Sequence, residues 1–273
     1  MKFRKLLILF IGIISVNGCT NESPLISEEE SIVVWAYIYT SEPVNSIRLT
    51  TTISLDSEDS NPPPINDAFV TLIKDGNRYE CVPSPGDSGY YHYEGTDLTI
   101  ETFDEFTIEI EYLGKTVTAK TIVPESPVEV QISSTTFVIP DFSDRSSLFA
   151  WRQSENREII VTWDNSEDDF YYVTLINIES DPVAIESFFN ARVREFVFPP
   201  INDDTYRIRL PMITHLGKHK ITVYKVNQEY VDLYESRNQD SRDLNEPLTN
   251  IVNGLGVFTA FNSDSSFITI TQN

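Results

Sequence analysis

The sequence predicts an all-β fold with minor α-helix, arranged as two β-sandwich domains in tandem. The chain contains 13 Tyr, 16 Phe and 3 Trp, and with its many Val, Ile and Thr this composition suits strands better than helices. Short segments alternate between apolar and polar residues and are separated by turn residues. Pro124 and Pro127 interrupt this pattern near the middle of the chain and mark a domain boundary.

The first domain is expected over residues 32–124 and holds about seven short strands. Its clearest strands are at residues 32–39, 47–55, 68–73, 79–82, 106–112 and 117–123. Asp75-Gly76-Asn77 predicts a hairpin between two of them. Such a run of short antiparallel strands resembles immunoglobulin-like and transthyretin-like sandwiches.

The second domain is expected over residues 125–273, with strands at 128–139, 159–163, 170–178, 221–226 and 267–270. Val161-x-Trp163, an acidic turn and Tyr171-x-Val173 resemble the B and C strands of fibronectin type III domains, in which the Trp fills the core. Trp35 and Trp163 both lie in core-like alternation. Two helical insertions are also predicted, because apolar residues recur near helical spacing at 183–196 and 228–237.

The first 19 residues carry the features of a secretory signal. Lys2, Arg4 and Lys5 precede an apolar run over residues 6–14, which is shorter than the about 20 residues that a membrane-spanning helix needs. Gly18-Cys19 resembles the lipobox of bacterial lipoproteins, in which the Cys thiol is acylated. We expect residues 1–18 to be a signal peptide, Cys19 to be lipidated and residues 19–31 to form an acidic tether. An ordinary secretory signal is the alternative.

Composition limits the partners. Without residues 1–18, the remaining 255 residues carry 17 basic and 42 acidic side chains, a formal charge of −25. Nucleic acids and anionic membranes repel such a surface, because binding to them needs cations that displace counterions. Nucleic-acid binding is therefore excluded, and the N-terminal lipid is the expected contact with the membrane. With Cys19 acylated, Cys81 has no disulfide partner and is expected to be a buried structural residue.

Two enzyme motifs are present only in part. Residues 86–89 (GDSG) copy the nucleophile signature of trypsin-like proteases, but the His and Asp of that triad precede the Ser, whereas every His of this chain follows Ser88. His215 and His219 have the spacing of zinc ligands on a helix, yet Gly217 between them indicates a turn. We expect loop and edge-strand histidines and no enzyme activity. A metal held by both histidines and a carboxylate is the alternative, and so is a hydrolase built on the loops.

Acidic side chains gather in three loops: Asp56, Glu58 and Asp59; Asp164, Glu167, Asp168 and Asp169; and Asp203 and Asp204. Clustered carboxylates can supply the oxygens that calcium needs. None of the loops matches the EF-hand pattern with its central Gly. We expect solvated loops and no bound metal or cofactor, with calcium as the alternative.

The densest aromatic cluster is Tyr90-Tyr91-His92-Tyr93. If alternate residues face outward, Tyr91 and Tyr93 can stack on a sugar or pack against a partner protein. Trp151 lies beside Arg152 in a less regular stretch and is the Trp expected to be exposed. Ligand or partner contacts are therefore predicted at Tyr91, Tyr93 and Trp151.

Several motifs follow one another in a characteristic order. After the lipobox come an A-x-V-x-L strand with an Asp-Gly turn at residues 68–76, TAKTIVP at 118–124 and EPLTNIVNGLGVF at 246–258, of which residues 253–258 are the most specific part. Together they resemble a family of Bacteroidota outer-membrane lipoproteins known only as a domain of unknown function. Members of that family are typically encoded beside TonB-dependent receptors.

The resemblance implies an accessory role in nutrient uptake. The expected protein is a non-enzymatic, lipid-anchored binding subunit associated with a TonB-dependent receptor, and the family offers no established catalytic residues to transfer. A free-standing glycan-binding or adhesion module at the cell surface is the alternative. We expect the protein on the surface side of the outer membrane. The acidic cluster that often follows the lipidated Cys lies later here, at residues 28–30, which leaves the periplasmic side open.

Overall fold

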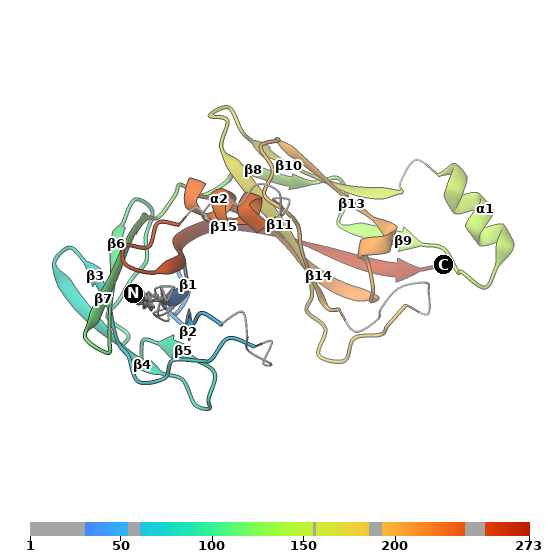
Figure 1. The fold of residues 1–273 in the computed structure, drawn as a ribbon. Helices are drawn as coiled ribbons and strands as arrows, with labels where there is room; N and C mark the ends of the chain where they lie inside the picture. The colour runs from blue at the N-terminus through green and yellow to red at the C-terminus, as the bar shows by residue number, and fades with distance from the viewer. Residues whose placement is uncertain (1–30, 54–60, 155–156, 186–192, 238–248) are drawn as a thin grey trace, which may run out of the picture.

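The computed structural model describes residues 31–53, 61–154, 157–185, 193–237 and 249–273. Strands dominate it (Figure 1), which confirms the predicted all-β fold with minor helix. One continuous sheet has twelve strands and a second sheet has three. Within these residues no helix is both long and apolar enough to cross a membrane. The predicted signal peptide, the lipidated Cys19 and nearly all of the tether lie outside the described residues.

The strands form two groups at opposite ends of the molecule (Figure 1), which we call the N-terminal and C-terminal modules. The N-terminal module begins with seven strands: β1 (Ile32–Tyr39), β2 (Ser46–Thr51), β3 (Phe69–Lys74), β4 (Asn77–Pro83), β5 (Tyr90–His92), β6 (Glu105–Tyr112) and β7 (Lys115–Ile122). Their order in the sheet is β1-β2-β5-β4-β3-β6-β7. Asp75-Gly76 and Leu113-Gly114 both have positive φ angles, as two-residue hairpin turns require, so the predicted hairpin at Asp75-Gly76 is confirmed.

Alternation along these strands fills the core of the N-terminal module. In β1 the buried residues are Ile32, Val34, Ala36 and Ile38, while the residues between them are half-buried. Cys81 on β4 is buried in the same core without a disulfide. Burial raises the pKa of its thiol to about 12, so the prediction of a structural cysteine is confirmed.

The C-terminal module is a sandwich of two sheets. Its elements are β8 (Val128–Ile132), β9 (Thr136–Ile139), α1 (Arg145–Gln153), β10 (Glu158–Asp164), β11 (Phe170–Asn177), β12 (Glu195–Val197), β13 (Thr205–Arg209), a 3₁₀ turn (Leu210–Met212), β14 (Gly217–Val226), α2 (Gln228–Arg237) and β15 (Leu255–Gln272). One sheet is β13-β10-β8, and the other is β12-β11-β14-β15 with β9 parallel to β15. Trp163 is buried between them with its ring 5.4 Å from that of Tyr171, which confirms it as a core residue.

The last strand belongs to both modules. Residues 255–261 of β15 pair in parallel with β1, and from Phe261 onward β15 pairs antiparallel with β14. Phe261 itself lies opposite Tyr39 on one side and Val226 on the other. The predicted division at residue 124 does not account for this strand, because the core of the N-terminal module includes Phe258 and Ala260.

The segment before β15 closes the N-terminal module. Val252 and Thr118 exchange backbone hydrogen bonds of 2.8 and 3.2 Å, which bring β7 back to the start of β15. The Asn250 side chain donates to the carbonyl oxygens of Phe258 (2.7 Å) and Lys120 (3.1 Å) and accepts from the Phe258 amide (3.0 Å). These bonds hold the turn between residues 250 and 258 and join it to β7, 130 positions earlier in the sequence.

Gly256 explains the most specific sequence motif. It lies opposite Val34 in the parallel ladder and has a φ of +102°. A Cβ atom at this position would lie 2.0 Å from the Val34 carbonyl oxygen. Only glycine therefore allows β15 to approach β1 at this point.

Aromatic side chains fill the junction between the modules. We define the tyrosine cluster as Phe261 with Tyr37, Tyr39, Tyr172, Tyr224 and Tyr230. The rings of Tyr172 and Tyr224 stack at 4.5 Å, and Phe261 lies 5.0 Å from Tyr39 and 5.1 Å from Tyr230. Tyr230 comes from α2, so the predicted helix at 228–237 is confirmed and covers this junction.

The predicted helix at residues 183–196 is wrong for the part of it that the structure describes, residues 183–185 and 193–196. Ala184 forms a bridge with His215, and Glu195–Val197 is the short strand β12. Residues 186–192 lie outside the described part. Phe196 and Phe198 face inward on either side of the exposed Val197, as in a strand, and their rings stack at 6.4 Å.

We predict that Gly256→Ala lowers the free energy of unfolding by about 3 kcal/mol or more, because β15 must move away from β1. Gly114→Ala is the matched control: its φ is also positive, but nothing lies within 4 Å of an added Cβ, so it should cost only about 1 kcal/mol. Chemical denaturation measures both. Equal losses would contradict the close approach at Gly256.

Candidate functional site

The structure corrects the predicted contact at Tyr91. Tyr91 on β5 is fully buried, and its hydroxyl accepts from the Ala68 amide (3.0 Å) and donates to the Ile65 carbonyl (3.1 Å). The exposed ring of this cluster is Tyr90, which lies under the Arg48 guanidinium. The strand alternates as predicted, but its faces are the reverse of those expected.

Tyr93 is half-buried against the core of the N-terminal module. Its ring meets Tyr79 edge-on at 5.5 Å, and its hydroxyl donates to Asp97 Oδ1 at 2.6 Å. The hydrogen bond to Asp97 raises the pKa of Tyr93 to about 12. Both ends of this side chain are engaged within the module, so Tyr93 offers little to a partner.

Trp151 lies on α1, a helix that the sequence reading did not predict. Asp144 caps its start by accepting from the amides of Ser146 and Ser147, and the Ser146 hydroxyl lowers the pKa of the Asp144 carboxyl. Trp151 faces the sandwich and packs against its core, whereas Phe149 on the same helix is 65% exposed. Trp151 is therefore half-buried and not freely exposed as predicted.

A groove lies between α1 and the end of the sandwich, and we call it the α1 groove. Its volume is ≈ 380 Å³, within the range of about 300–1,000 Å³ for small-molecule sites. Phe137 and Ile159 supply apolar wall beside Trp151, and hydroxyl groups supply much of the rest. The hydroxyl-bearing residues are Ser133, Ser134, Thr136, Ser147 and Ser154.

A second hollow is also lined by Trp151, and we call it the arginine hollow. Its volume is ≈ 350 Å³, and it is lined by Trp151, Arg157, Glu158, Arg209, Leu210 and Pro211. The antiparallel ladder of β10 and β13 places Arg209 opposite Glu158, and Arg207 forms an ion pair with the same carboxylate. Trp151 and Glu158 line both hollows, so the two are neighbours.

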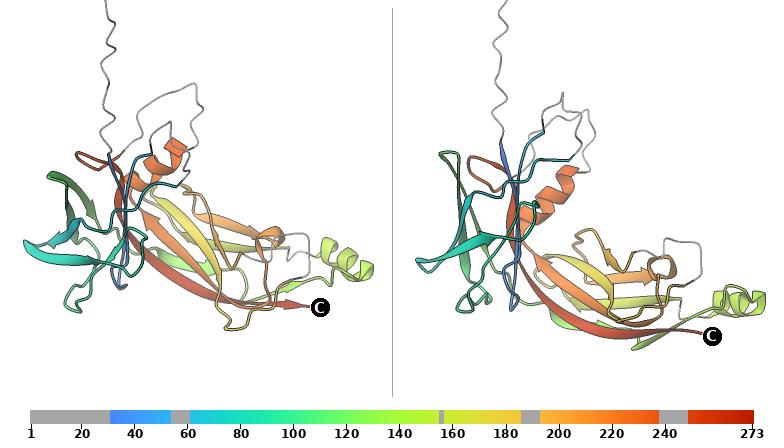
Figure 2. Two further views of the ribbon diagram at one scale, coloured as in Figure 1. Left: turned by 60° about the horizontal axis from the view of Figure 1, so that its bottom comes forward. Right: turned by 90° about the horizontal axis from the view of Figure 1, so that it is seen from below.

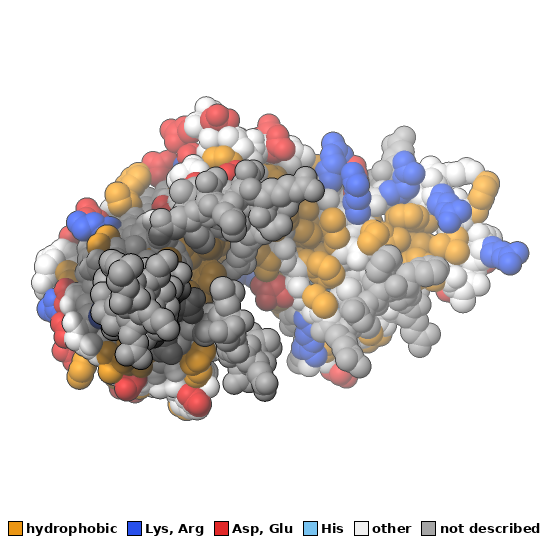
Figure 3. Space-filling model, in the orientation of Figure 1, with side chains coloured by type: hydrophobic (Ala, Val, Ile, Leu, Met, Phe, Trp, Pro, Cys, Tyr) orange, Lys and Arg blue, Asp and Glu red, His pale blue; other side chains and the backbone are white. Residues whose placement is uncertain are grey.

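The charge of this end differs from that of the chain as a whole. On the face drawn in Figure 3, Lys and Arg side chains gather around hydrophobic ones toward the end that carries α1. The local arginines come from two elements and a loop: Arg152 is on α1, Arg207 and Arg209 are on β13, and Arg157 lies just before β10. A positive end on a chain of formal charge −22 favours negatively charged ligands.

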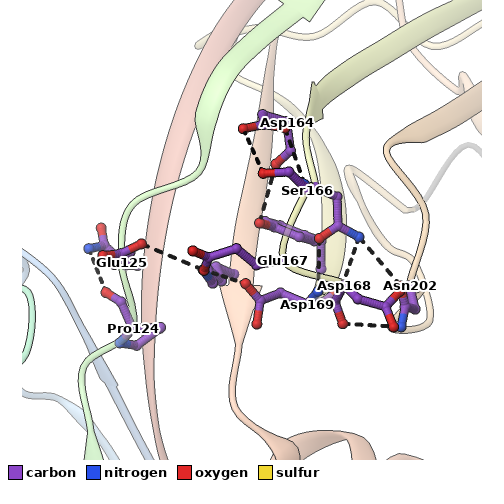
Figure 4. A network of polar contacts seen from close by, with 12 residues as sticks. Pro124, Glu125, Asp164, Ser166, Glu167, Asp168, Asp169 and Asn202 are labelled. Atoms are coloured by element: carbon purple, nitrogen blue, oxygen red, sulfur yellow. Dashed lines mark hydrogen bonds and ion pairs between the residues drawn. The ribbon is translucent and has the colours of Figure 1, made fainter.

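The acidic turn between β10 and β11, for which calcium is the alternative to a solvated loop, contacts a lysine. Lys225 Nζ lies 2.6 Å from Asp169, 3.8 Å from Glu167 and 3.9 Å from Glu125. Figure 4 shows Glu125 facing this turn from the link between the modules. No metal-binding group of three His, Cys, Asp or Glu residues occurs in the described residues. Asp56, Glu58 and Asp59 lie outside them, and Asp203 and Asp204 precede β13.

His215 lies in the segment before β14, as predicted for a loop histidine, whereas His219 is not on an edge strand as predicted; both are buried. His219 lies on β14, which has strands on both sides. Its Nδ1 is 3.0 Å from the Gly217 carbonyl and its Nε2 is 3.3 Å from Asn177 Nδ2, an arrangement that suits a neutral ring protonated on Nδ1. Burial lowers the pKa of His219. His215 Nδ1 lies 2.8 Å from Thr214 Oγ1.

Comparisons with known proteins add a family match. The model of a family described as a domain of unknown function (DUF4249) matches residues 20–266. No curated protein matches the chain. A crystal structure of titin domains is similar at 11% identity and a TM-score of 0.22, covering 88% of this chain and 66% of that one. The FN1–FN3 domains of chicken CNTN1 are similar at 14% identity and a TM-score of 0.24, covering 71% and 58%. The chain thus spans less than two thirds of each structure. Its fold class is established by the strands of the chain itself.

We predict that acid destabilises the protein partly through His219. The pKa of His219 lies below its ordinary 6.5 in the folded state, so the unfolded chain binds protons first as the pH falls, and stability drops below about pH 6.5. His219→Gln should reduce this drop. Thermal unfolding measured across this pH range gives the slopes. A wild-type slope in His219→Gln would contradict the assignment.

Proposed function

We propose that this chain, which belongs to the DUF4249 family of domains of unknown function, is a lipid-anchored binding subunit of an outer-membrane uptake system. It would capture or deliver a nutrient beside a TonB-dependent receptor and would carry out no chemistry. The observation that carries this proposal is the site around Trp151, at the end of the molecule opposite the N-terminal module (Figure 1).

The anchor is the first part of the argument. The charged, apolar and small-residue order of residues 1–19 supports cleavage before Cys19 and acylation of its thiol. Thirteen positions after Cys19 the chain enters β1 at residue 32. An acyl chain at Cys19 would raise the concentration of the modules near a membrane partner.

The position of the site is the second part. Figure 2 shows α1 at the far end of the C-terminal module in both views, away from β1, which follows the tether. The tyrosine cluster and β15 join the two modules across the junction. The α1 groove is therefore held at a distance from the anchored end, where a ligand or a receptor loop can reach it.

The chemistry of the site supports binding. Its hydroxyls, one indole and arginines are groups that hold a ligand by hydrogen bonds and stacking. The histidines of the described residues are engaged elsewhere, His92 with Ser84 and the other two inside the C-terminal module. Recognition of a ligand needs no more than these groups.

A free-standing surface glycan-binding module is the second candidate. The hydroxyl-rich lining of the α1 groove beside Trp151 favours it, because aromatic rings and hydroxyls suit a sugar. The two candidates share the binding site and differ in whether a receptor is attached.

The proposal predicts that a TonB-dependent barrel protein co-purifies with the native lipoprotein from detergent-solubilised outer membranes. Cys19→Ala should abolish the membrane location and with it the complex. Trp151→Ala should weaken the complex at least several-fold if the receptor contacts this end. Mass spectrometry of the purified material identifies and quantifies the partner.

Phe149→Ala is the matched control, because Phe149 lies on the same helix but points to solvent. It should leave the complex intact. Purification without a barrel protein, combined with retention on immobilised glycans, would favour the second candidate. A processed N-terminus without lipid would overturn both.

A further inference from the structure

The arginine hollow holds two guanidinium groups that the fold leaves available. Glu158 is engaged by Arg207 and lies 3.9 Å from Arg209 Nε. Arg157 donates to the Arg152 carbonyl through one nitrogen only, at 3.3 Å, and a guanidinium has five donors. Arg157 and Arg209 therefore retain donors that can bind a carboxylate in the hollow they line.

Trp151 lines both hollows. Its indole Nε1 has no hydrogen-bond partner within the described residues, but this nitrogen is closed to solvent, as is Nε1 of Trp163 inside the sandwich core. The nitrogen therefore does not itself mark a ligand. The aromatic side chain of Trp151 can still stack on one, because it lines both hollows.

The lining of the α1 groove narrows the class of ligand. The same cavity as the indole ring is lined by Ser133, Ser134, Thr136, Ser147 and Ser154. Four of their hydroxyls already bond within the chain: those of Ser133 and Ser147 accept from backbone amides, and those of Ser134 and Ser154 donate to backbone carbonyls. A hydroxyl has one donor and two acceptor sites, so each of these can still pair with a hydroxyl of a ligand, and a ring face stacks on a sugar. An inorganic anion would use the arginines but would leave this groove empty.

We propose that the site binds an oligosaccharide that carries carboxylate groups. A carboxylate lies in the arginine hollow against Arg157 and Arg209, and a neighbouring sugar crosses Trp151 into the α1 groove. The positive charge of this end complements the ligand, on a chain that is otherwise strongly acidic. This inference rests on the proposed function, since it names the ligand that the binding subunit captures.

Calorimetric titration of the chain from residue 20 onward with short oligogalacturonates tests the proposal. The methyl-esterified oligosaccharides are the matched ligand, because they keep every hydroxyl and lose the charge. The acid form should bind about tenfold or more tightly than the ester, and its affinity should fall with added salt. Arg157→Gln and Arg209→Gln should each remove most of this preference.

Control variants separate recognition from folding. Arg78→Gln removes an arginine that pairs with Glu109 on the N-terminal module and should leave binding unchanged. Trp151→Ala removes the ring that lines both hollows, so it should weaken the acid and the ester by the same factor. Unfolding temperatures show whether each variant keeps its fold.

Equal affinity for acid and ester would overturn carboxylate recognition. Preference for a glutamate-rich peptide over the oligosaccharide, or full competition by inorganic phosphate, would overturn the sugar. Absence of binding to either oligosaccharide would overturn the proposal as a whole. The proposed receptor association is measured separately, by the barrel protein that co-purifies, so the failure of one does not decide the other.

Discussion

The pairing of one residue, Phe261, with both modules is the constraint on which the rest of the structure depends. Phe261 is 1% exposed, lies opposite Tyr39 of β1 and Val226 of β14, and is surrounded by tyrosine rings from four elements. Because a single strand crosses this point, neither module is complete without the other. The end that carries α1 is thereby fixed relative to the end that follows the tether.

Local patterns were enough to predict most strands. Alternation at residues 32–39 and the Asp75-Gly76 turn depend on near neighbours, so they can be read directly. The double role of β15 could not be predicted, because it depends on partners more than 200 positions away in β1. The motif at residues 253–258 was recognised as specific, yet its cause, the contact of Gly256 with Val34, appears only when the two strands are paired.

The site was predicted less well, for reasons that differ by residue. Alternation around Tyr91 gives the period but not the face, and the Ala68 amide and Ile65 carbonyl decide the face. The sequence indicates Trp151 as a contact residue but does not predict the helix α1 that carries it. Asp144 is a typical N-cap residue and is the only signal for the start of that helix. The arginines on β13 gave no sequence signal, because they reach Glu158 only through the pairing of β10 with β13.

Shared pairing has a thermodynamic consequence for the whole protein. If β15 and the tyrosine cluster join the modules, they unfold together, and differential scanning calorimetry measures this directly. The account predicts a single transition whose calorimetric enthalpy equals its van't Hoff enthalpy. Two separate transitions, one for each module, would contradict it.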